Sequence, residues 1–284
     1  MRFPRKMTVE LTARCNFRCP YCYCVWHEFP KLAGPELDTD GWKDVLDRFA
    51  ADGVKDVLFT GGEALLRKDV LVIVDYARAR LPSAKLTLFT NASRLTEDLI
   101  LAFKERHVRL ATSLQGLVTY GEMTGTKRRY NRLLRVVARA KELGWPMSVS
   151  MTITTANRAE APDMFAAAAL SGASFIQLGA MMAEGRGKRH LGLMISRAEW
   201  EAVKDEIRKL PNVGVPYSFA DEFICTCREQ PPELLSAWAD LKAKRCPAGR
   251  SFGVIGPDGA YRICLHALPP SVGTEKAVFQ KWKD

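Results

Sequence analysis

Short apolar runs alternate with stretches of helical periodicity through the first two thirds of the chain. The apolar runs lie at Met7 to Leu11, Val57 to Thr60, Leu86 to Thr90, Val108 to Leu114, Met147 to Thr154 and Phe175 to Gly179. Runs this short, rich in β-branched residues and bounded by turn residues, predict strands. Strands that alternate with helices predict right-handed crossovers and a parallel sheet.

The stretches between these runs carry helix signals. Helices are predicted near residues 39–52, 68–80, 96–106, 130–143 and 159–170. Thr39 or Asp40 is the predicted N-cap of the first, and Gly53, Gly144 and Gly172 stand where a helix end needs a left-handed residue. Six strand–helix units over about 180 residues predict an α/β fold, an open partial (β/α)6 barrel whose ligands gather at the carboxyl ends of the strands.

The pattern changes after Met182. A glycine loop at 185–187 precedes a predicted helix at 196–210, and short strands at 251–255 and 260–264 flank the turn Gly256-Pro257-Asp258-Gly259. A short amphipathic helix is predicted at 275–283. We therefore predict a barrel domain at 1–195 and a smaller C-terminal extension at 196–284.

Composition places the chain among ordinary globular proteins. Of 284 residues, 47% are hydrophobic and 26% charged, which argues against a disordered or fibrous chain. No apolar run approaches the roughly 18 residues of a membrane span, and the start lacks the features of a signal peptide. We expect a cytoplasmic protein with no membrane partner.

The net charge is +10, from 42 basic and 32 acidic residues. The basic residues cluster only modestly, at 127–135 and 186–189, without interleaved aromatic residues. This pattern favours a plain basic surface over a nucleic-acid partner. An acidic peptide or a phosphorylated small molecule stays open as a partner.

The eight cysteines lie at the two ends of the chain, with none between Cys24 and Cys225. A secreted disulfide scaffold is short and spreads its cysteines throughout. Thiol-rich ends on a chain like this one are more typical of metal or cluster sites.

The first cysteine group is Cys15-x3-Cys19-x2-Cys22, directly after the first predicted strand. A cubane iron–sulfur cluster held wholly by protein takes four cysteines, so three leave one iron open to an outside ligand. The alternative is zinc, whose usual frame is two Cys-x2-Cys pairs. Here the spacing differs and no second nearby pair completes a zinc site.

A glycine-rich segment, Gly61-Gly62-Glu63, ends the second predicted strand. Glycines let the backbone come close to a ligand, and a carboxylate suits an ammonium group. The alternative is a plain turn with an exposed acid.

Together these two motifs resemble the signature of the radical S-adenosylmethionine superfamily. The resemblance implies a 4Fe-4S cluster on Cys15, Cys19 and Cys22, whose fourth iron is chelated by the amino and carboxylate groups of S-adenosylmethionine. It also implies that the reduced cluster cleaves this cofactor to a 5′-deoxyadenosyl radical, which abstracts hydrogen from a C–H bond. The protein orients and shields that step.

The resemblance also implies further cofactor contacts. In the family, the segment matching Gly61, Gly62 and Glu63 meets the methionyl amino group, and an Asn such as Asn91 often ends the third strand. Ser113 and Gln115 end the fourth strand, where members commonly have Ser-x-Asp-Gly. An amide at Gln115 still hydrogen-bonds a ribose hydroxyl but has no acid role. The segment 177–187, which includes Glu184-Gly185-Arg186-Gly187, resembles the loop that passes near the adenosyl group.

The C-terminal cysteines resemble the start of the extension called SPASM, and its shorter relative called twitch, which hold auxiliary iron–sulfur clusters. A full extension continues with more cysteines, whereas 20 residues without any follow Cys264. The resemblance therefore implies one auxiliary cluster of the 4Fe-4S type on Cys227, Cys246 and Cys264. Cys225 either completes that set or is a separate thiol.

A spare thiol near the substrate would quench the substrate radical, whereas an auxiliary cluster would accept an electron from it. Cys24 and Cys225 are the candidate hydrogen donors. Relatives with this extension imply a ribosomally made peptide as substrate, modified by epimerisation, cross-linking or oxidation. Oxidation of a small natural-product precursor such as an aminocyclitol is the alternative. A non-catalytic zinc or redox-sensing protein is the third possibility.

The resemblance also implies two protein partners. A reductase, flavodoxin or ferredoxin is the expected electron donor. Only 14 residues precede Cys15, so we expect no N-terminal peptide-recognition domain, and a peptide would be recognised either by the basic surface of the barrel or by a separate protein.

Overall fold

The structure is a computed structural model that describes residues 2–28, 34–127, 130–220 and 248–267. The chain divides into two compact units. The first holds residues 1–16, 23–111 and 247–284, and the second holds 17–22 and 112–246. The predicted helix at 275–283 and three of the C-terminal cysteines, Cys225, Cys227 and Cys246, lie outside the described residues.

The first unit is built on strands β1 (Lys6–Glu10), β2 (Asp56–Thr60) and β3 (Lys85–Phe89), with the start of β4 (Val108–Ser113). They lie in the order β4-β3-β2-β1, all parallel, and Val9 faces Phe59 in the register of β1 and β2. Helices α1 (Val25–Glu28), α2 (Thr39–Asp52), α3 (Val70–Arg80) and α4 (Glu97–Glu105) and the 3-10 turn η2 (Ala64–Leu66) connect them.

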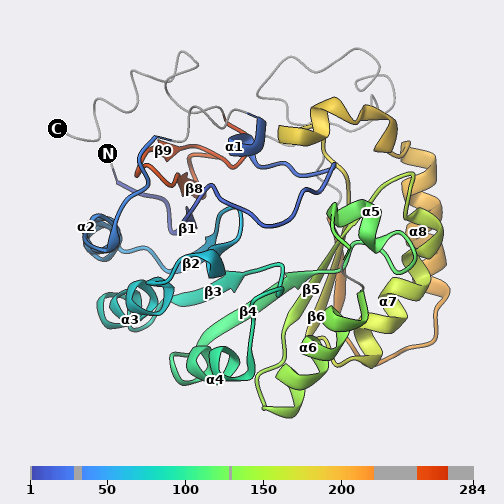
Figure 1. The fold of residues 1–284 in the computed structure, drawn as a ribbon, viewed down its shortest axis with the longest axis horizontal. Coiled ribbons are helices and arrows are strands. Elements are labelled where there is room, and N and C mark those ends of the chain that lie inside the picture. The colour runs from blue at the N-terminus through green and yellow to red at the C-terminus, as the bar shows by residue number, and fades with distance from the viewer. Residues whose placement is uncertain (1, 29–33, 128–129, 221–247, 268–284) are drawn as a thin grey trace. The chain divides into compact units, whose positions relative to one another are not determined.

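A hairpin from the far end of the sequence extends this sheet beyond β1 (Figure 1). Strand β8 (Phe252–Ile255) pairs with β1 in parallel, and β9 (Tyr261–Arg262) pairs with β8 antiparallel. The predicted turn is present, because Gly259 N donates to Gly256 O and Gly256 N to Ala260 O. The sequence predicted the hairpin but not its pairing with the first strand.

The second unit carries strands β5 (Ser148–Ile153), β6 (Phe175–Ala180) and β7 (Tyr217–Ala220), which are parallel neighbours. Residues 112–113 of β4 belong to it, and Leu114 N donates to Ser150 O beyond the strand end. Its helices are α5 (Tyr120–Thr124), α6 (Tyr130–Glu142), α7 (Ala161–Leu170) and α8 (Arg197–Lys209), with 3-10 turns η3 (Arg158–Glu160), η4 (Gly185–Arg189) and η5 (Leu191–Leu193).

The predicted α/β fold with an open, mostly parallel sheet is confirmed. All six predicted strands and the main helices are present, and Gly53, Gly144 and Gly172 all have positive φ, as the cap prediction requires. Two details were wrong. Asp38, not Thr39 or Asp40, caps α2 through its side chain, and β7 was not predicted. In the part of the chain that the structure describes, the strand order begins at β7 and ends at β9, so the sheet does not close.

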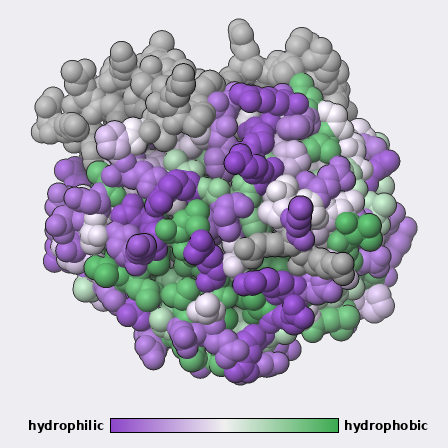
Figure 2. Space-filling view, viewed as in Figure 1, coloured by the Kyte–Doolittle hydropathy of each residue, from purple (hydrophilic) through white to green (hydrophobic). Residues whose placement is uncertain are grey.

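Apolar side chains from strands and helices form the core of each unit. Phe59 of β2 and Trp42 and Phe49 of α2 are fully buried in the first unit, and Met151 of β5 and Trp200 of α8 are buried in the second. On the face drawn in Figure 2, hydrophilic side chains are interspersed with smaller hydrophobic areas. Within the described ranges, no helix is both long enough and apolar enough to cross a membrane.

Candidate functional site

The Gly-Gly-Glu segment continues β2 as a ladder against the stretch that leads to Cys15. Gly62 N donates to Thr12 O at 2.7 Å, and Glu63 N donates to Arg14 O at 2.8 Å. A Cβ at Gly62 would lie closer than 3.0 Å to Arg14 O, and one at Gly61, whose φ is +138°, would crowd Thr12 O. Glycine is therefore required at both positions because the backbone of Thr12 and Arg14 lies so close. The sequence alone did not reveal this reason.

Glu63 is buried, and its carboxylate ties the end of β2 to the end of β3. One oxygen accepts from Thr90 Oγ1 at 2.6 Å and Leu65 N at 3.0 Å, and the other accepts from Asn91 N at 2.7 Å. Burial raises the pKa of Glu63, although these three donors oppose the rise. A carboxylate has about four lone-pair sites, so three are already used within the protein.

Asn91 connects the loop after β3 to the residue that follows Cys15. Its side-chain nitrogen donates to Asn16 Oδ1 at 2.9 Å, and Asn16 Nδ2 donates to Ser93 Oγ at 2.8 Å. Asn91 Oδ1 accepts from Ser93 N. Asn16 was not singled out from the sequence, because an asparagine between two cysteines gives no pattern of its own.

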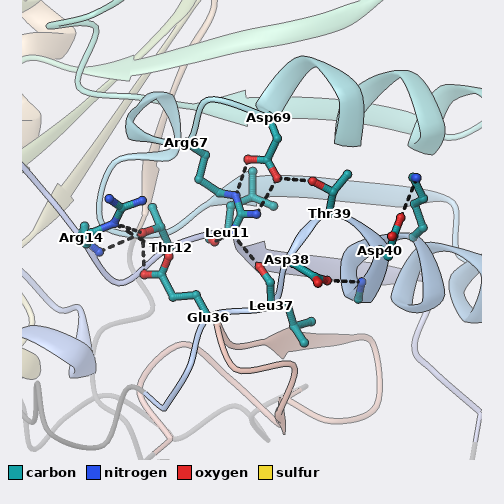
Figure 3. A network of polar contacts seen from close by, with 12 residues as sticks. Leu11, Thr12, Arg14, Glu36, Leu37, Asp38, Thr39, Asp40, Arg67 and Asp69 are labelled. Atoms are coloured by element: carbon teal, nitrogen blue, oxygen red, sulfur yellow. Dashed lines mark hydrogen bonds and ion pairs between the residues drawn. The ribbon is translucent and has the colours of Figure 1, made fainter.

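A second polar network holds the stretch that leads to Cys15 (Figure 3). Glu36 accepts from Thr12 Oγ1 at 2.7 Å and Ala13 N at 2.9 Å. Arg67 donates to Leu11 O at 3.1 Å and to both oxygens of Asp69. The Arg67 guanidinium holds the pKa of Asp69 down at about 2. The backbone just before Cys15 is thus fixed from two sides.

In the second unit, the end of α5 and the 3-10 turn η4 both hydrogen-bond to the loop that carries Cys19 and Cys22. On one side, Thr124 O accepts from Arg18 N at 3.0 Å and lies 3.9 Å from Cys19 Sγ. On the other side, Arg186 N donates to Cys22 O at 2.8 Å, and Arg186 Nη1 donates to Cys19 O at 3.0 Å. The loop is therefore held through its backbone groups. Neither of its two thiols is in a disulfide.

Gln115, at the predicted ribose position, ties the end of β4 to β5. It is buried, and its Oε1 accepts from Thr152 N at 2.9 Å, while its backbone oxygen accepts from Asn157 Nδ2. Thr152 N uses one of the two lone pairs of Oε1, so the amide nitrogen and the second lone pair are left to serve a ligand. Ser113 lies half-buried at the end of β4.

Glu160 holds the loop that follows Gln115. Its carboxylate accepts from three successive backbone N–H groups, those of Leu117, Val118 and Thr119, at 2.5, 2.8 and 3.0 Å. Burial alone would raise the pKa of Glu160, but these donors outweigh it and the pKa lies below its usual range. No sequence pattern marks this residue, because its partners are backbone groups 41 to 43 positions away.

The hairpin loop that carries Cys264 is anchored by a buried ion pair. Arg262, fully buried, pairs with the carboxylate of Glu10 at the end of β1. It also donates to Leu265 O at 3.2 Å and Ala267 O at 3.0 Å. Trp26 Nε1 donates to Glu10 at 2.7 Å. Burial raises the pKa of Glu10, against the lowering influence of Arg262.

This anchor brings the Cys264 loop beside the segment that follows Cys22. The Tyr23 and His266 rings meet edge to face, with centroids 5.5 Å apart. Cys24 and Cys264 are both buried and in no disulfide among the described residues. Within those same residues, no three His, Cys, Asp or Glu side chains are grouped closely enough for a single metal ion.

The decisive comparison is with protein-family models. Residues 9–168, more than half of the chain, match the model described as the radical SAM superfamily. The chain belongs to the radical SAM superfamily. The matched range includes the Cys15 motif, the Gly-Gly-Glu segment and strands β2 to β5. The resemblance inferred from the motifs is confirmed, and the chain is an enzyme of this superfamily.

Curated relatives extend the match toward the C-terminus. The chain is 30% identical over 262 residues to a protein of Gluconobacter oxydans named PqqA peptide cyclase, covering 87% of this chain and 69% of that one. It is 29% identical over 191 residues to the sporulation killing factor maturation protein SkfB of Bacillus subtilis, covering 64% and 44%. The chain thus spans about half to two thirds of these relatives' lengths.

Solved structures share the fold. Streptococcus suis SuiB bound to S-adenosylmethionine matches with a TM-score of 0.69 and 17% identity, over 99% of this chain and 66% of SuiB. Native anSMEcpe with bound AdoMet matches with a TM-score of 0.70 and 14% identity, over 97% and 80%. At these identities the likeness concerns the fold alone.

Proposed function

We propose that this chain is a radical S-adenosylmethionine enzyme that modifies a ribosomally made peptide. The observation that carries the proposal is its 30% identity, over 87% of its length, to a protein named for cyclising a peptide. SkfB is named for maturation of a killing factor, and SuiB shares the fold in a structure bound to its precursor peptide SuiA. Among the possible reactions, the proposal leaves epimerisation, cross-linking and oxidation to be decided by experiment.

Cys15, Cys19 and Cys22 would hold the 4Fe-4S cluster. The residues fit this group: all three are partly exposed and none is in a disulfide. The backbone on both sides of the motif is fixed, by the Gly-Gly-Glu ladder before it and by Arg186 around its end. When bound and reduced, the cluster supplies the electron that cleaves S-adenosylmethionine to the 5′-deoxyadenosyl radical.

The strand ends would bind S-adenosylmethionine. Backbone groups of Gly61 and Gly62 and the remaining lone pair of Glu63 suit the methionyl ammonium. Asn91, Ser113 and the amide nitrogen of Gln115 provide polar groups for the rest of the cofactor. These roles are inferred from the superfamily pattern together with the hydrogen-bonding capacity that the structure leaves to each side chain.

The C-terminal part, residues 196–284, would carry one auxiliary iron–sulfur cluster. Cys264 is buried beside the Tyr23 segment, and Cys227 and Cys246, with Cys225 as a fourth, would complete the ligand set. Cys24 and Cys225 remain the proposed hydrogen donors. A reductase, flavodoxin or ferredoxin in the cytoplasm would supply electrons, and a separate protein would present the peptide.

The test begins with the chain reconstituted without oxygen, with dithionite and S-adenosylmethionine. We expect 5′-deoxyadenosine to form, and about eight irons per chain against about four in a variant with Cys15, Cys19 and Cys22 changed to Ala. The same variant should form no 5′-deoxyadenosine. Equal cofactor cleavage by both proteins would refute the site.

The substrate is tested by co-expressing the chain with each short peptide encoded beside its gene. Mass spectrometry detects a loss of two hydrogens on cross-linking or dehydrogenation, and deuterium uptake from heavy water on epimerisation. The triple cysteine variant is the control. Unmodified peptides, together with oxidation of an aminocyclitol by the same preparation, would refute the peptide proposal and favour the small-molecule reaction.

A further inference from the structure

Arg186 makes two contacts with the loop that carries Cys19 and Cys22. Its backbone N–H donates to Cys22 O, and its guanidinium donates to Cys19 O. Cys19 O also accepts from Cys22 N at 3.3 Å, so the guanidinium binds the turn that sets the spacing of these two residues. One residue thus holds both ends of the x2 interval of the motif.

The turn around Arg186 is itself tightly constrained. Gly187 N also faces Cys22 O, at 3.4 Å. A Cβ at Gly187 would lie 2.9 Å from both Met181 Cε and Met182 O. Larger side chains are therefore excluded at this position. The close contacts of Gly187 constrain the backbone from which Arg186 reaches the cysteine loop.

The charge of Arg186 has no carboxylate partner among the residues that the structure describes. In those residues the guanidinium donates only to Cys19 O, whereas the contact with Cys22 O is made by the backbone N–H of Arg186. The neighbouring acid, Glu184, is buried and pairs with Lys188 at 3.5 Å. A half-buried guanidinium without a counter-ion is costly unless an anion lies near it.

A 4Fe-4S cluster on three thiolates supplies such an anion. Four irons and four sulfides carry a charge of +2 in the oxidised form, so three thiolates bring the total to −1, and one added electron brings it to −2. A fixed positive charge stabilises the more negative, reduced form. Because reduction is the step that precedes cofactor cleavage, a cation at this place has a direct use.

We propose that Arg186 is a positioning residue that also raises the reduction potential of the cluster on Cys15, Cys19 and Cys22. It holds the Cys19–Cys22 turn through two carbonyls, and its charge, which has no carboxylate partner among the described residues, favours the reduced cluster. The inference rests on the proposed function, because it requires the cluster. Its chemistry is a one-electron reduction, in which dithionite or a reduced flavodoxin is oxidised and the cluster gains the electron.

The test is a redox titration of the reconstituted holoenzyme with dithionite, followed by electron paramagnetic resonance. The cluster is identified as the signal that is absent from the triple cysteine variant. The variants are Arg186→Met, which keeps the length but removes the charge, and Arg186→Lys, which keeps the charge. Arg189→Met, an exposed residue of the same turn η4, is the matched control for the loss of one positive charge.

At one fixed potential we expect the ratio of reduced to oxidised cluster to fall about tenfold in Arg186→Met, which corresponds to about 59 mV for one electron. Arg186→Lys should recover most of this ratio, and Arg189→Met should leave it unchanged. Iron content per chain reports separately whether the turn still holds the cluster.

Unchanged ratios in Arg186→Met at full iron content would overturn the inference and leave the proposed function intact. If Arg186→Met loses iron, the ratio of reduced to oxidised cluster in Arg186→Lys decides, and a ratio there about tenfold below that of the native chain would also overturn the charge effect. A native chain without the signal that depends on Cys15, Cys19 and Cys22 would instead refute the proposed function itself.

Discussion

The buried pair between Glu10 and Arg262 connects the first strand to a hairpin more than 240 residues later in the sequence, and replacing Arg262 with Met tests its importance. Both side chains are almost fully buried, at 1% and 0% exposure. Removing one member of such a pair costs about 3–5 kcal/mol, because the other is left as an uncompensated buried charge. For a chain of this size we expect a fall in melting temperature of about 10 °C.

The pH dependence of stability provides a second, independent test of this prediction. Burial raises the pKa of Glu10 in the folded protein, so the folded state favours the protonated acid, and stability falls as pH rises from the unfolded pKa to the folded one. Without Arg262 the pKa rises further. The destabilisation by Arg262→Met should therefore be greater at pH 8 than at pH 5.

The assay is thermal and urea unfolding without oxygen, followed by circular dichroism. Arg80→Met is the matched control, since Arg80 pairs with Asp47 at 2.5 Å with both side chains exposed by more than two fifths, and such pairs contribute about 0–1 kcal/mol. Adding Glu10→Gln to Arg262→Met should recover part of the stability by removing the buried charge. Equal losses in the two Arg→Met variants, or a loss independent of pH, would refute the reasoning.

Three further changes test other parts of the site. Gly62→Ala should lower stability and iron content, because its Cβ would crowd Arg14 O. Gly192→Ala is the control and should change neither, because a Cβ there would meet nothing within 4 Å. Equal iron content in the two variants would contradict the importance of the Gly62 backbone contact. Glu160→Gln should lose about 1–3 kcal/mol near neutral pH. Because the pKa of Glu160 is depressed, its stabilisation is lost as pH falls, so unfolding of the variant should depend less on acid; parallel pH profiles would count against this role. Cys24→Ala should still cleave S-adenosylmethionine but form less product, and full product would exclude Cys24 as a hydrogen donor.

Most of the parallel sheet was predictable because its signals are local. Each of the six predicted strands is a short apolar run, and α2, α6 and α7 are each followed within two residues by a glycine with positive φ. Strand β7 was missed because it is four residues long and follows two prolines. The pairing of β8 with β1 was missed for a different reason: the hairpin signal is local, whereas its partner strand is about 245 positions away in the sequence.

The sequence singles out the motif residues, but it does not identify the residues that hold them. The cysteine spacing predicts a cluster because ligand type and spacing are sufficient for that inference. The loops that hold the motif come from Thr124 and Arg186, more than 100 residues later. The contacts made by Thr124 O and by the Arg186 N–H are backbone contacts that place almost no demand on residue type, and the Arg186 guanidinium binds a backbone oxygen 167 positions away, so no local sequence pattern marks either of them.

Glu63 and Gln115 show how parallel strands constrain the residues at their ends. Glu63, just after β2, accepts the backbone N–H of Asn91 in the loop after β3. Gln115, just after β4, accepts the backbone N–H of Thr152 in β5. Where parallel strands end, backbone donors lose their ladder partners, and leaving them unpaired in a buried place is costly.

A polar residue at such a position therefore has a structural role even when no ligand is bound. The longer side chain of Gln115 reaches Thr152 N without placing a charge in a site that is only 3% exposed. The neutral amide that stands where the superfamily commonly has an acid is thus explained by the protein's own backbone. Any contact of these two side chains with S-adenosylmethionine would use the hydrogen-bonding capacity that remains, which is one lone pair of Glu63 and, at Gln115, the amide nitrogen and one lone pair of Oε1.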